Sequence, residues 1–181
     1  HGLSPEISLA LVGLGYEDLT EVQQAVIPAV LAGQDLIVSA PTGSGKTAAF
    51  AIPVCEQVTL TLRQPQALVL TPTRELALQV QQTFSQIGRF KKIRCAAIFG
   101  KQPFMQQRNE LRQRVHVVIG TPGRTLDHLE KDHLDLSQIR WLILDEADKM
   151  LELGFIEQVE AIIGRVSQNR TTLVFSATMS E

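Results

Sequence analysis

The stretch that decides the fold of this chain is Ala40-Pro41-Thr42-Gly43-Ser44-Gly45-Lys46-Thr47. It follows a short apolar run, Leu36–Ala40, and opens a segment with helical character. The two glycines let the backbone curl so that successive N–H groups point at one anion, and the start of a helix attracts negative charge. Lys46 can reach the β- and γ-phosphates of a nucleotide, and the Thr47 hydroxyl can ligate Mg²⁺. The stretch therefore predicts a phosphate-binding loop, although Ala40 stands where the general pattern has glycine.

Further apolar runs continue this strand–helix pattern along the chain. They are rich in Val, Ile and Leu, and they are Ala67–Thr71, Cys95–Phe99, Val117–Gly120, Trp141–Asp145 and Thr172–Ser176. Near-continuous apolar runs are typical of strands covered on both faces. Helical patterns lie between most of them, as in Arg74–Ile87, while Val58–Gln66 and Lys131–Ser137 are expected to be surface connections. We predict an α/β fold: a single domain over residues 1–181 with a mainly parallel sheet covered by helices on both faces.

Composition restricts the class of protein. The chain has 181 residues, of which 44% are hydrophobic and 20% charged, so one packed core is expected and disorder is not. No apolar run approaches the ~20 residues that span a bilayer, and no signal segment opens the chain, so we predict a cytoplasmic protein without a membrane partner. Cys55 and Cys95 lack a CxxC spacing and the four histidines lack a metal-ligand spacing. We interpret the thiols as buried in a reducing compartment and the histidines as incidental.

The net charge of −2 argues against binding polyanions through bulk charge, but the charges are unevenly spread. Eight basic residues, opposed only by Glu110, are Arg89, Lys91, Lys92, Arg94, Lys101, Arg108, Arg112 and Arg114. Between Asp127 and Glu160 there are ten acids and three basic residues. The two blocks indicate two faces with different partners, and solvated loops and helix surfaces explain them equally well.

The acidic tetrapeptide Asp145-Glu146-Ala147-Asp148 directly follows the apolar segment Trp141–Leu144. A carboxylate at the end of a buried strand beside a phosphate-binding loop is suited to hold Mg²⁺. Because Mg²⁺ keeps several waters, we expect Asp145 to bind it through water. Glu146 is then the candidate to orient and deprotonate an attacking water. Together with Lys46, these residues are the predicted catalytic groups.

The phosphate-binding loop, the acidic tetrapeptide and three other segments resemble the DEAD-box family of ATP-dependent RNA helicases. The other segments are Pro72-Thr73-Arg74-Glu75-Leu76-Ala77, Thr121-Pro122-Gly123-Arg124 and Ser176-Ala177-Thr178. The resemblance covers essentially the whole chain and implies an N-terminal RecA-like domain with ATP and Mg²⁺ as cofactors and RNA as partner. It also implies a monomer whose second RecA-like domain, with an arginine finger, would follow Glu181 in the parent chain. Phe99–Gln102, Leu126–Lys131 and Phe155–Ile163 are similar to a bacterial subgroup linked to ribosomal RNA, which implies a role in ribosome assembly.

The resemblance also assigns site residues. The residues that it assigns to nucleotide binding are Tyr16, Gln23 and the loop Ala40, Pro41, Thr42, Gly43, Ser44, Gly45, Lys46 and Thr47. Thr47 and Asp145 are assigned to metal contacts. Contacts to the RNA backbone fall to Pro72, Thr73, Arg74, Gly100, Lys101, Thr121, Gly123 and Arg124. Coupling between domains falls to Asp148, Ser176 and Thr178. The strand of Ser176 is expected between the strand of the phosphate loop and the strand of Asp145.

Gln23 has a physical basis as the reader of adenine, because its amide offers both a donor and an acceptor for adenine N6 and N7. The surrounding Gly15-Tyr16 and Thr20–Gln23 resemble the family's glutamine motif, although Leu19 stands where the family has proline. Lys101 likewise replaces the second glycine of a Gly-Gly pair.

Other functions remain compatible with the same residues. The chain can belong to a DNA translocase or another P-loop ATPase, or to a nucleotide-gated RNA clamp that does no enzymatic work. The resemblance favours an ATPase that unwinds short RNA duplexes, with little activity in this domain alone.

Overall fold

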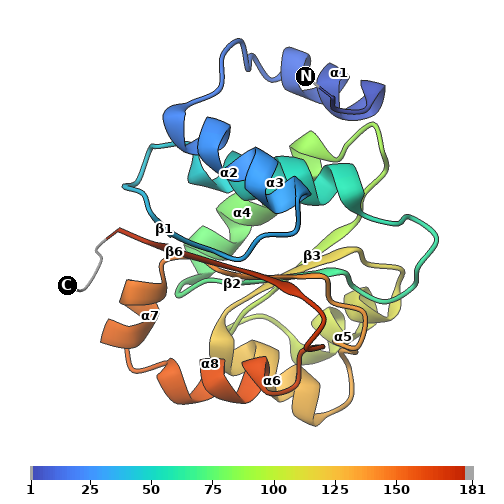
Figure 1. Cartoon of the computed structure of the whole chain (residues 1–181). Helices are drawn as coiled ribbons and strands as arrows, with labels where there is room; N and C mark the ends of the chain where they lie inside the picture. Colours follow the sequence, from blue (N-terminus) through green and yellow to red (C-terminus); the bar gives the residue numbers. More distant parts are fainter. Residues whose placement is uncertain (1, 178–181) are drawn as a thin grey trace.

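A parallel β-sheet forms the centre of the computed structural model, which describes residues 2–177 (Figure 1). Within these residues the sheet has six strands in the order β1-β6-β5-β2-β4-β3, and every neighbouring pair is parallel. The strands are β1 (Leu36–Ser39), β2 (Ala67–Leu70), β3 (Cys95–Ile98), β4 (Val117–Gly120), β5 (Trp141–Leu144) and β6 (Thr171–Ser176). All carboxyl ends therefore meet at one edge of the sheet.

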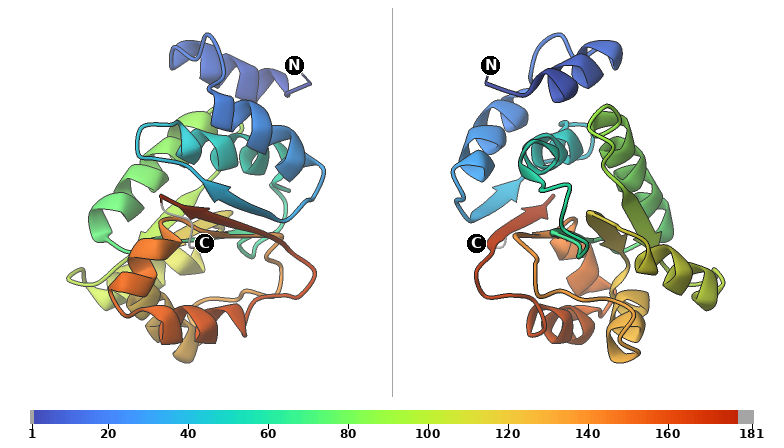
Figure 2. Two further views of the ribbon diagram at one scale, coloured as in Figure 1. Left: turned by 60° about the vertical axis from the view of Figure 1, so that its left-hand side comes forward. Right: turned by 90° about the vertical axis from the view of Figure 1, so that its right-hand side faces the viewer.

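Helices cover both faces of the sheet, as the two views of Figure 2 show. One face carries α2 (Glu21–Leu31), α3 (Lys46–Gln57) and α4 (Arg74–Ile87), with α1 (Pro5–Gly13) packed outside them. The other face carries α5 (Phe104–Arg112), α6 (Pro122–Glu130), α7 (Ala147–Glu152) and α8 (Ile156–Ile163). The predicted three-layer α/β domain is confirmed for the described residues.

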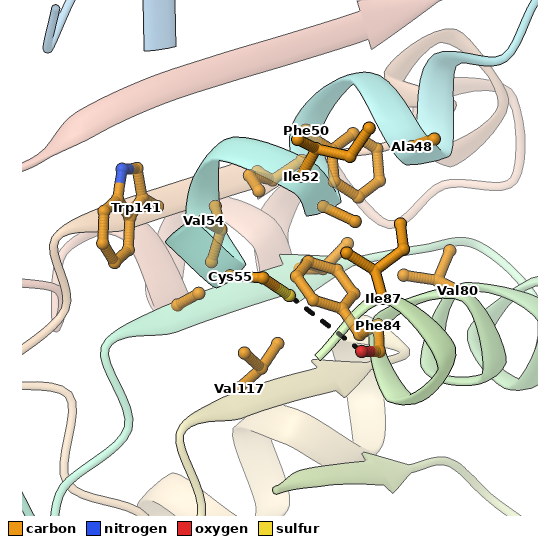
Figure 3. Packing of buried hydrophobic residues seen from close by; sticks show 14 of the residues in the cluster. Ala48, Phe50, Ile52, Val54, Cys55, Val80, Phe84, Ile87, Val117 and Trp141 are labelled. Atoms are coloured by element: carbon orange, nitrogen blue, oxygen red, sulfur yellow. Dashed lines mark hydrogen bonds between the residues drawn. The ribbon is translucent and has the colours of Figure 1, made fainter. Parts of the chain in front are cut away.

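Each face of the sheet has its own hydrophobic core. Under α3 and α4 the rings of Phe50 and Phe84 lie 5.9 Å apart, and those of Phe50 and Phe175 lie 5.2 Å apart. Figure 3 shows how Phe50, Phe84 and Trp141 fill the space between helices and sheet. Since α3 is buried along most of its length, the phosphate loop that precedes it is fixed to a rigid element.

The predicted strands agree with the observed ones to within one residue at each end, and the predicted helix over 74–87 is α4. β6 lies between β1 and β5, as the resemblance implied. The two predicted surface connections are only partly exposed. Gln66 is fully buried, and its side-chain amide bonds to the N–H and carbonyl of Thr59 at 2.7 and 2.8 Å. Leu134 and Leu136 are buried too, because short connections also cover the end of the core.

Candidate active site at the carboxyl edge of the sheet

The order of the strands sorts the sequence motifs into two groups along one edge. The phosphate loop follows β1, Ser176 ends β6, and Asp145 follows β5. The remaining motifs follow the other half of the sheet, with Pro72–Ala77 after β2, Thr121–Arg124 after β4 and Gly100 after β3. Ligands of open α/β sheets bind outside the carboxyl ends of strands. The predicted nucleotide residues and the predicted RNA residues therefore occupy adjacent halves of one edge.

The phosphate loop has the backbone that its glycines predict. Gly43 and Gly45 have φ values of 87° and 82°, in the left-handed region that favours glycine. The φ of Gly45 favours glycine there, and a Cβ at this position would lie 2.5 Å from Nε2 of Gln23 and displace that amide. Ala40 is buried, and its N–H donates to the Ser176 carbonyl at 2.9 Å, which anchors the start of the loop to β6. Pro41, Thr42 and Gly43 are exposed, and Ser44 and Thr47 are half-buried.

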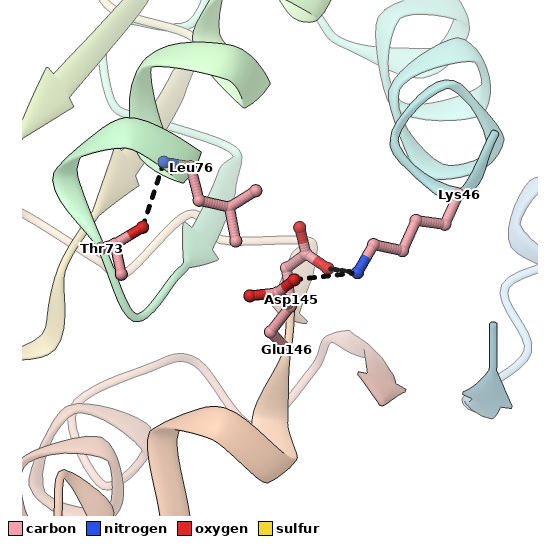
Figure 4. Close-up of polar contacts among 5 residues, drawn as sticks. All are labelled: Lys46, Thr73, Leu76, Asp145 and Glu146. Atoms are coloured by element: carbon pink, nitrogen blue, oxygen red, sulfur yellow. Dashed lines mark hydrogen bonds and ion pairs between the residues drawn. The ribbon is translucent and has the colours of Figure 1, made fainter. Parts of the chain in front are cut away.

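Lys46 and the two acidic residues after β5 come together, as predicted (Figure 4). Nζ of Lys46 lies 3.1 Å from Oδ1 of Asp145 and 3.7 Å from Oε1 of Glu146. Lys46 and Asp145 are buried, at 7% and 0% exposure. Burial raises the pKa of the Asp145 carboxyl, and the neighbouring ammonium of Lys46 opposes that rise. The arrangement holds a cation and a carboxylate at the mouth of the phosphate loop.

Asp145 also has the chemistry of a ligand for Mg²⁺. Its Oδ2 is buried and has no hydrogen-bond partner among the described residues, so one carboxylate oxygen is left without the partner that burial normally demands. No group of three or more His, Cys, Asp or Glu side chains in residues 2–177 forms a metal cage. A site with one carboxylate fits Mg²⁺, which completes its shell with waters and nucleotide phosphates.

Glu146 holds an unusual backbone conformation, with φ 54° and ψ 51°, directly before α7. A non-glycine residue in this region costs roughly 1–2 kcal/mol, and such strain is concentrated at functional sites. The side chain is half-buried and points toward Lys46 in Figure 4. The turn therefore directs the Glu146 carboxylate into the space beside the phosphate loop.

Gln23 is buried against the phosphate loop. Its Oε1 accepts from the N–H of Thr20 at 3.0 Å, and its Nε2 donates to the Gly45 carbonyl at 3.2 Å. The first bond belongs to a capping box at the start of α2. An amide has two donors and two lone pairs, so one donor and one lone pair remain for another ligand. Tyr16, the other predicted adenine contact, is half-buried and lines a hollow beside Leu19 and Gln24.

The predicted RNA residues after β2 and β4 begin helices. Thr73 caps α4, with its Oγ1 accepting from the N–H of Leu76 at 3.2 Å, and the guanidinium of exposed Arg74 lies 5.3 Å from the centre of the Phe99 ring. Thr121 precedes α6, but its side chain makes no capping hydrogen bond. Pro72 is buried and Gly123 is exposed. Thr73 therefore has a structural role as a helix cap, and Arg74 beside it is exposed.

Lys101 shows what replacing the second glycine entails. Its φ is 64°, so a lysine occupies a left-handed position next to exposed Gly100. The backbone thus keeps a glycine-type turn after β3, and an exposed cation is added to it.

Arg124 is held by a buried polar network that the sequence analysis missed. Its Nη1 donates to the Gln102 carbonyl at 3.0 Å and to Oε1 of Gln107 at 2.9 Å. Nε2 of His128 contacts the same Gln107 oxygen at 3.1 Å, and Nε2 of Gln107 donates to the Phe99 carbonyl at 2.9 Å. Gln107 and His128 are buried, at 3% and 0% exposure. The network ties the predicted RNA residue Arg124 to α5 and to the end of β3.

His128 is not incidental, which corrects the interpretation of the histidines. Its Nδ1 lies 2.9 Å from Nδ1 of His133, and its ring stacks on Phe104 with 4.3 Å between centroids. Because Gln107 presents its oxygen, Nε2 of His128 carries the proton and Nδ1 accepts from His133. Burial, followed by the charges of His133 and Arg124, lowers the pKa of His128 to about 4. The sequence did contain a signal for this network, because Arg124 and His128 are one helical turn apart and their side chains therefore share one face of a helix.

Asp148 is half-buried in the first turn of α7, and Ser176 is buried at the end of β6. Their proposed part in coupling two domains stays a prediction, and Thr178 lies outside the described residues. Both cysteines are free thiols; Cys55 is buried, as predicted, whereas Cys95 is only partly buried. Burial raises the pKa of both thiols, that of Cys95 to about 12. No helix of the described chain has the length and apolar character needed to cross a membrane.

A phosphate loop after β1 that faces an acidic pair after β5 defines a P-loop nucleotide-binding domain of the RecA type. Comparison with known proteins narrows this class. Residues 20–181 match the DEAD/DEAH box helicase family, and the chain belongs to that family.

Named relatives agree with this membership. The chain is 55% identical over 179 residues to the ATP-dependent RNA helicase DbpA of Bacillus subtilis, covering 99% of this chain and 37% of DbpA. It is 46% identical over 180 residues to the DEAD-box ATP-dependent RNA helicase CshA of Geobacillus kaustophilus, covering 99% and 38%. The chain thus spans less than two fifths of the length of these curated relatives.

Solved structures show the same fold. A DEAD box protein from Methanococcus jannaschii superposes with a TM-score of 0.95 at 40% identity, covering 99% of this chain and 49% of the other. A hypothetical ATP-dependent RNA helicase from Sulfolobus tokodaii gives 0.91 at 41% identity, covering 99% and 52%.

Proposed function

We propose that this chain is the N-terminal, ATP- and RNA-binding domain of an ATP-dependent RNA helicase that unwinds short RNA duplexes. The observation that carries the proposal is the order of motifs along the carboxyl edge: nucleotide residues follow β1, β6 and β5, and RNA residues follow β2, β4 and β3. Asp145 follows β5, and Pro72-Thr73-Arg74 follows the neighbouring β2, so the two halves meet there. This adjacency gives a direct route by which a change at the nucleotide reaches RNA.

Each residue near the phosphate loop has a role in this function. Lys46 would bind the β- and γ-phosphates, and Thr47 and Asp145 would hold Mg²⁺, Asp145 through water. Bound there, Mg²⁺ supplies charge neutralisation at the phosphates. Glu146 would orient the attacking water and accept its proton. Gln23 and Tyr16 would contact adenine.

The proposal also requires a second RecA-like domain in the same parent chain, which would add an arginine finger to the site. The relatives DbpA and CshA are each more than twice as long as the part that this chain matches. A monomeric state, a cytoplasmic location and a role in ribosome assembly stay predictions. Phosphate release by a full-length parent, stimulated by RNA and not by DNA, would separate a helicase from a clamp and from a DNA translocase.

The RNA part of the proposal can be tested on this chain. We expect weak, salt-dependent binding of single strands without sequence preference, because the contacts are to the backbone. Arg74→Ala and Arg124→Ala should weaken binding of all sequences alike in fluorescence anisotropy titrations. A strong base preference in this domain would contradict the proposal.

A further inference from the structure

The edge of the sheet opposite to the motifs carries a groove lined by positive charge, which we call the amino-edge groove. It consists of two adjoining hollows of about 420 and 230 Å³ that share Arg114. Their cationic lining residues are Arg63, Lys91, Lys92, Arg94, Arg112 and Arg114. No acidic residue lines either hollow.

Three connections, distant in sequence, bring these charges together. Arg63 precedes β2, the stretch 91–94 precedes β3, and the stretch 112–114 precedes β4. Because the strands are parallel, the connections that lead into them gather at the amino ends, on the right in Figure 1. The basic block of the sequence is thereby divided, since Lys101 lies at the opposite, carboxyl edge.

Five of the six cations have no partner within residues 2–177. The ion pairs found among these residues are those of Lys46 alone. Lys91 is used structurally, since its Nζ donates to the carbonyls of Cys55 and Glu56 at 2.8 and 2.6 Å and so caps the end of α3. The other five side chains are exposed, and four of them are arginines, whose planar fork matches a phosphate.

The cations of the amino-edge groove act together on His116, which forms the floor of the groove. His116 is buried, its Nδ1 accepts from the N–H of Arg94 at 2.9 Å, and its Nε2 donates to the Leu60 carbonyl at 3.2 Å. This pairing keeps the ring neutral. After burial, the charges of Arg114, Arg94 and Lys91 lower the pKa of His116 further. A neutral floor beneath cationic walls suits an anionic chain.

We propose that the amino-edge groove binds the phosphate backbone of an RNA strand, at a site separate from the motifs. The inference rests on the proposed function for the identity of the polyanion. A third hollow continues the groove past Arg63 and Arg112, and there Asp132 and Asp135 are mixed with the cation of Arg165, so the purely cationic lining ends. Since none of the nucleotide motifs contributes to the groove, it would hold RNA with or without ATP while the carboxyl edge binds and releases its own segment.

The test is anisotropy of a labelled single-stranded RNA with this chain, without nucleotide, over a series of KCl concentrations. Arg94→Glu/Arg114→Glu removes two cations of the groove. Lys131→Glu/Lys149→Glu makes the same change in net charge at exposed positions that line neither hollow. Log affinity falls with log salt, and each lost phosphate contact makes this fall less steep by about 0.7. The loss of two contacts should therefore reduce the steepness by about 1.4, which corresponds to about 25-fold weaker binding at 0.1 M salt than for the wild type.

Equal affinities and slopes for the groove variant and its control would overturn the proposal, and an acidic protein would then be the better partner. If the double reversal lowers the thermal midpoint, Arg94→Gln/Arg114→Gln replaces it, with a smaller loss of affinity expected and no loss refuting the site. The variant Arg74→Ala/Arg124→Ala separates this inference from the proposed function. If only the groove variant loses RNA affinity, the amino-edge groove is supported and the proposed motif contacts are refuted. If only the motif variant loses affinity, the motif contacts are supported and the groove is refuted.

Discussion

Oε1 of Gln107 lies 2.9 Å from Nη1 of Arg124 and accepts its hydrogen bond. The two side chains belong to α5 and α6, which follow different strands, and the bond fixes the guanidinium at the part of the edge where we propose RNA contacts. Because Gln107 is buried, its proposed effect on RNA is exerted through Arg124, and Gln107 is a positioning residue in that proposal.

We therefore expect Gln107→Leu to weaken RNA binding by about tenfold, because a buried charge-assisted hydrogen bond contributes roughly 1.5 kcal/mol. Nucleotide binding should stay unchanged. Gln106→Leu, at an exposed neighbouring position, is the control. Gln107→Glu keeps an acceptor for Arg124 and should restore part of the affinity, which a merely structural defect would not allow.

Lys46→Ala should remove measurable nucleotide binding. The side chain is the cation that the phosphate loop places beside Asp145 and Glu146, and its loss leaves two carboxylates facing the phosphates. Titration with a fluorescent ADP measures the effect, and Lys149→Ala is a control at an exposed lysine. Equal affinities for the variant and the wild type would refute the assignment of the phosphate loop.

Gln23→Ala should weaken ATP binding by roughly 1–3 kcal/mol and leave GTP binding unchanged, if the amide reads adenine. The structure adds a competing explanation, because Gln23 also bonds to the Gly45 carbonyl and to the N–H of Thr20. A variant that loses ATP and GTP affinity equally would show that Gln23 acts by shaping the loop. Gln24→Ala, at an exposed position of the same helix, controls for changes in α2.

This chain alone should bind ATP·Mg²⁺ and hydrolyse it at a negligible rate, with or without RNA. Arginine fingers contribute roughly 10³–10⁵ in rate. Arg74 and Arg124 follow β2 and β4, where we propose that they contact RNA, so neither is assigned to the nucleotide. The loop is also exposed at Pro41–Gly43, so its dipoles act in water. Steady-state phosphate release is the assay. Robust turnover that disappears in Glu146→Gln would show that a second domain is dispensable.

Acid should destabilise the chain through His128. Its folded-state pKa of about 4 lies below the ordinary value of 6.5, so the unfolded chain binds more protons between these values. The contribution of neutral His128 to the free energy of unfolding is therefore complete above pH 6.5. It is lost as pH falls toward 4, by at most about 1.4 kcal/mol per pH unit. Thermal midpoints at pH 7.5 and pH 5 should differ less in His128→Gln than in the wild type. An unchanged difference would place the titration elsewhere.

The sequence was sufficient for the fold because local signals and burial agreed. Runs such as Val117–Gly120 are short, apolar throughout and rich in β-branched residues, which favours a strand covered on both faces, and β4 has those bounds. The phosphate loop was predictable for the same reason, since glycines at positions 43 and 45 and Lys46 act within one turn of chain and their spacing alone fixes the geometry. The proximity of Asp145 to the phosphate loop also followed from the sequence, given parallel strands that end at one edge, whereas its ion pair with Lys46 was not predicted.

Only the tertiary structure decided which residues support Arg124 and where the basic block lies. Gln107 and His128 are separated by 21 positions, so their contact depends on how α5 and α6 pack. The six cations of the amino-edge groove come from three connections whose proximity depends on strand order, β2 beside β4 and β4 beside β3. Local spacing determines a loop that acts through its own backbone, whereas charges from distant segments converge only after the sheet has formed.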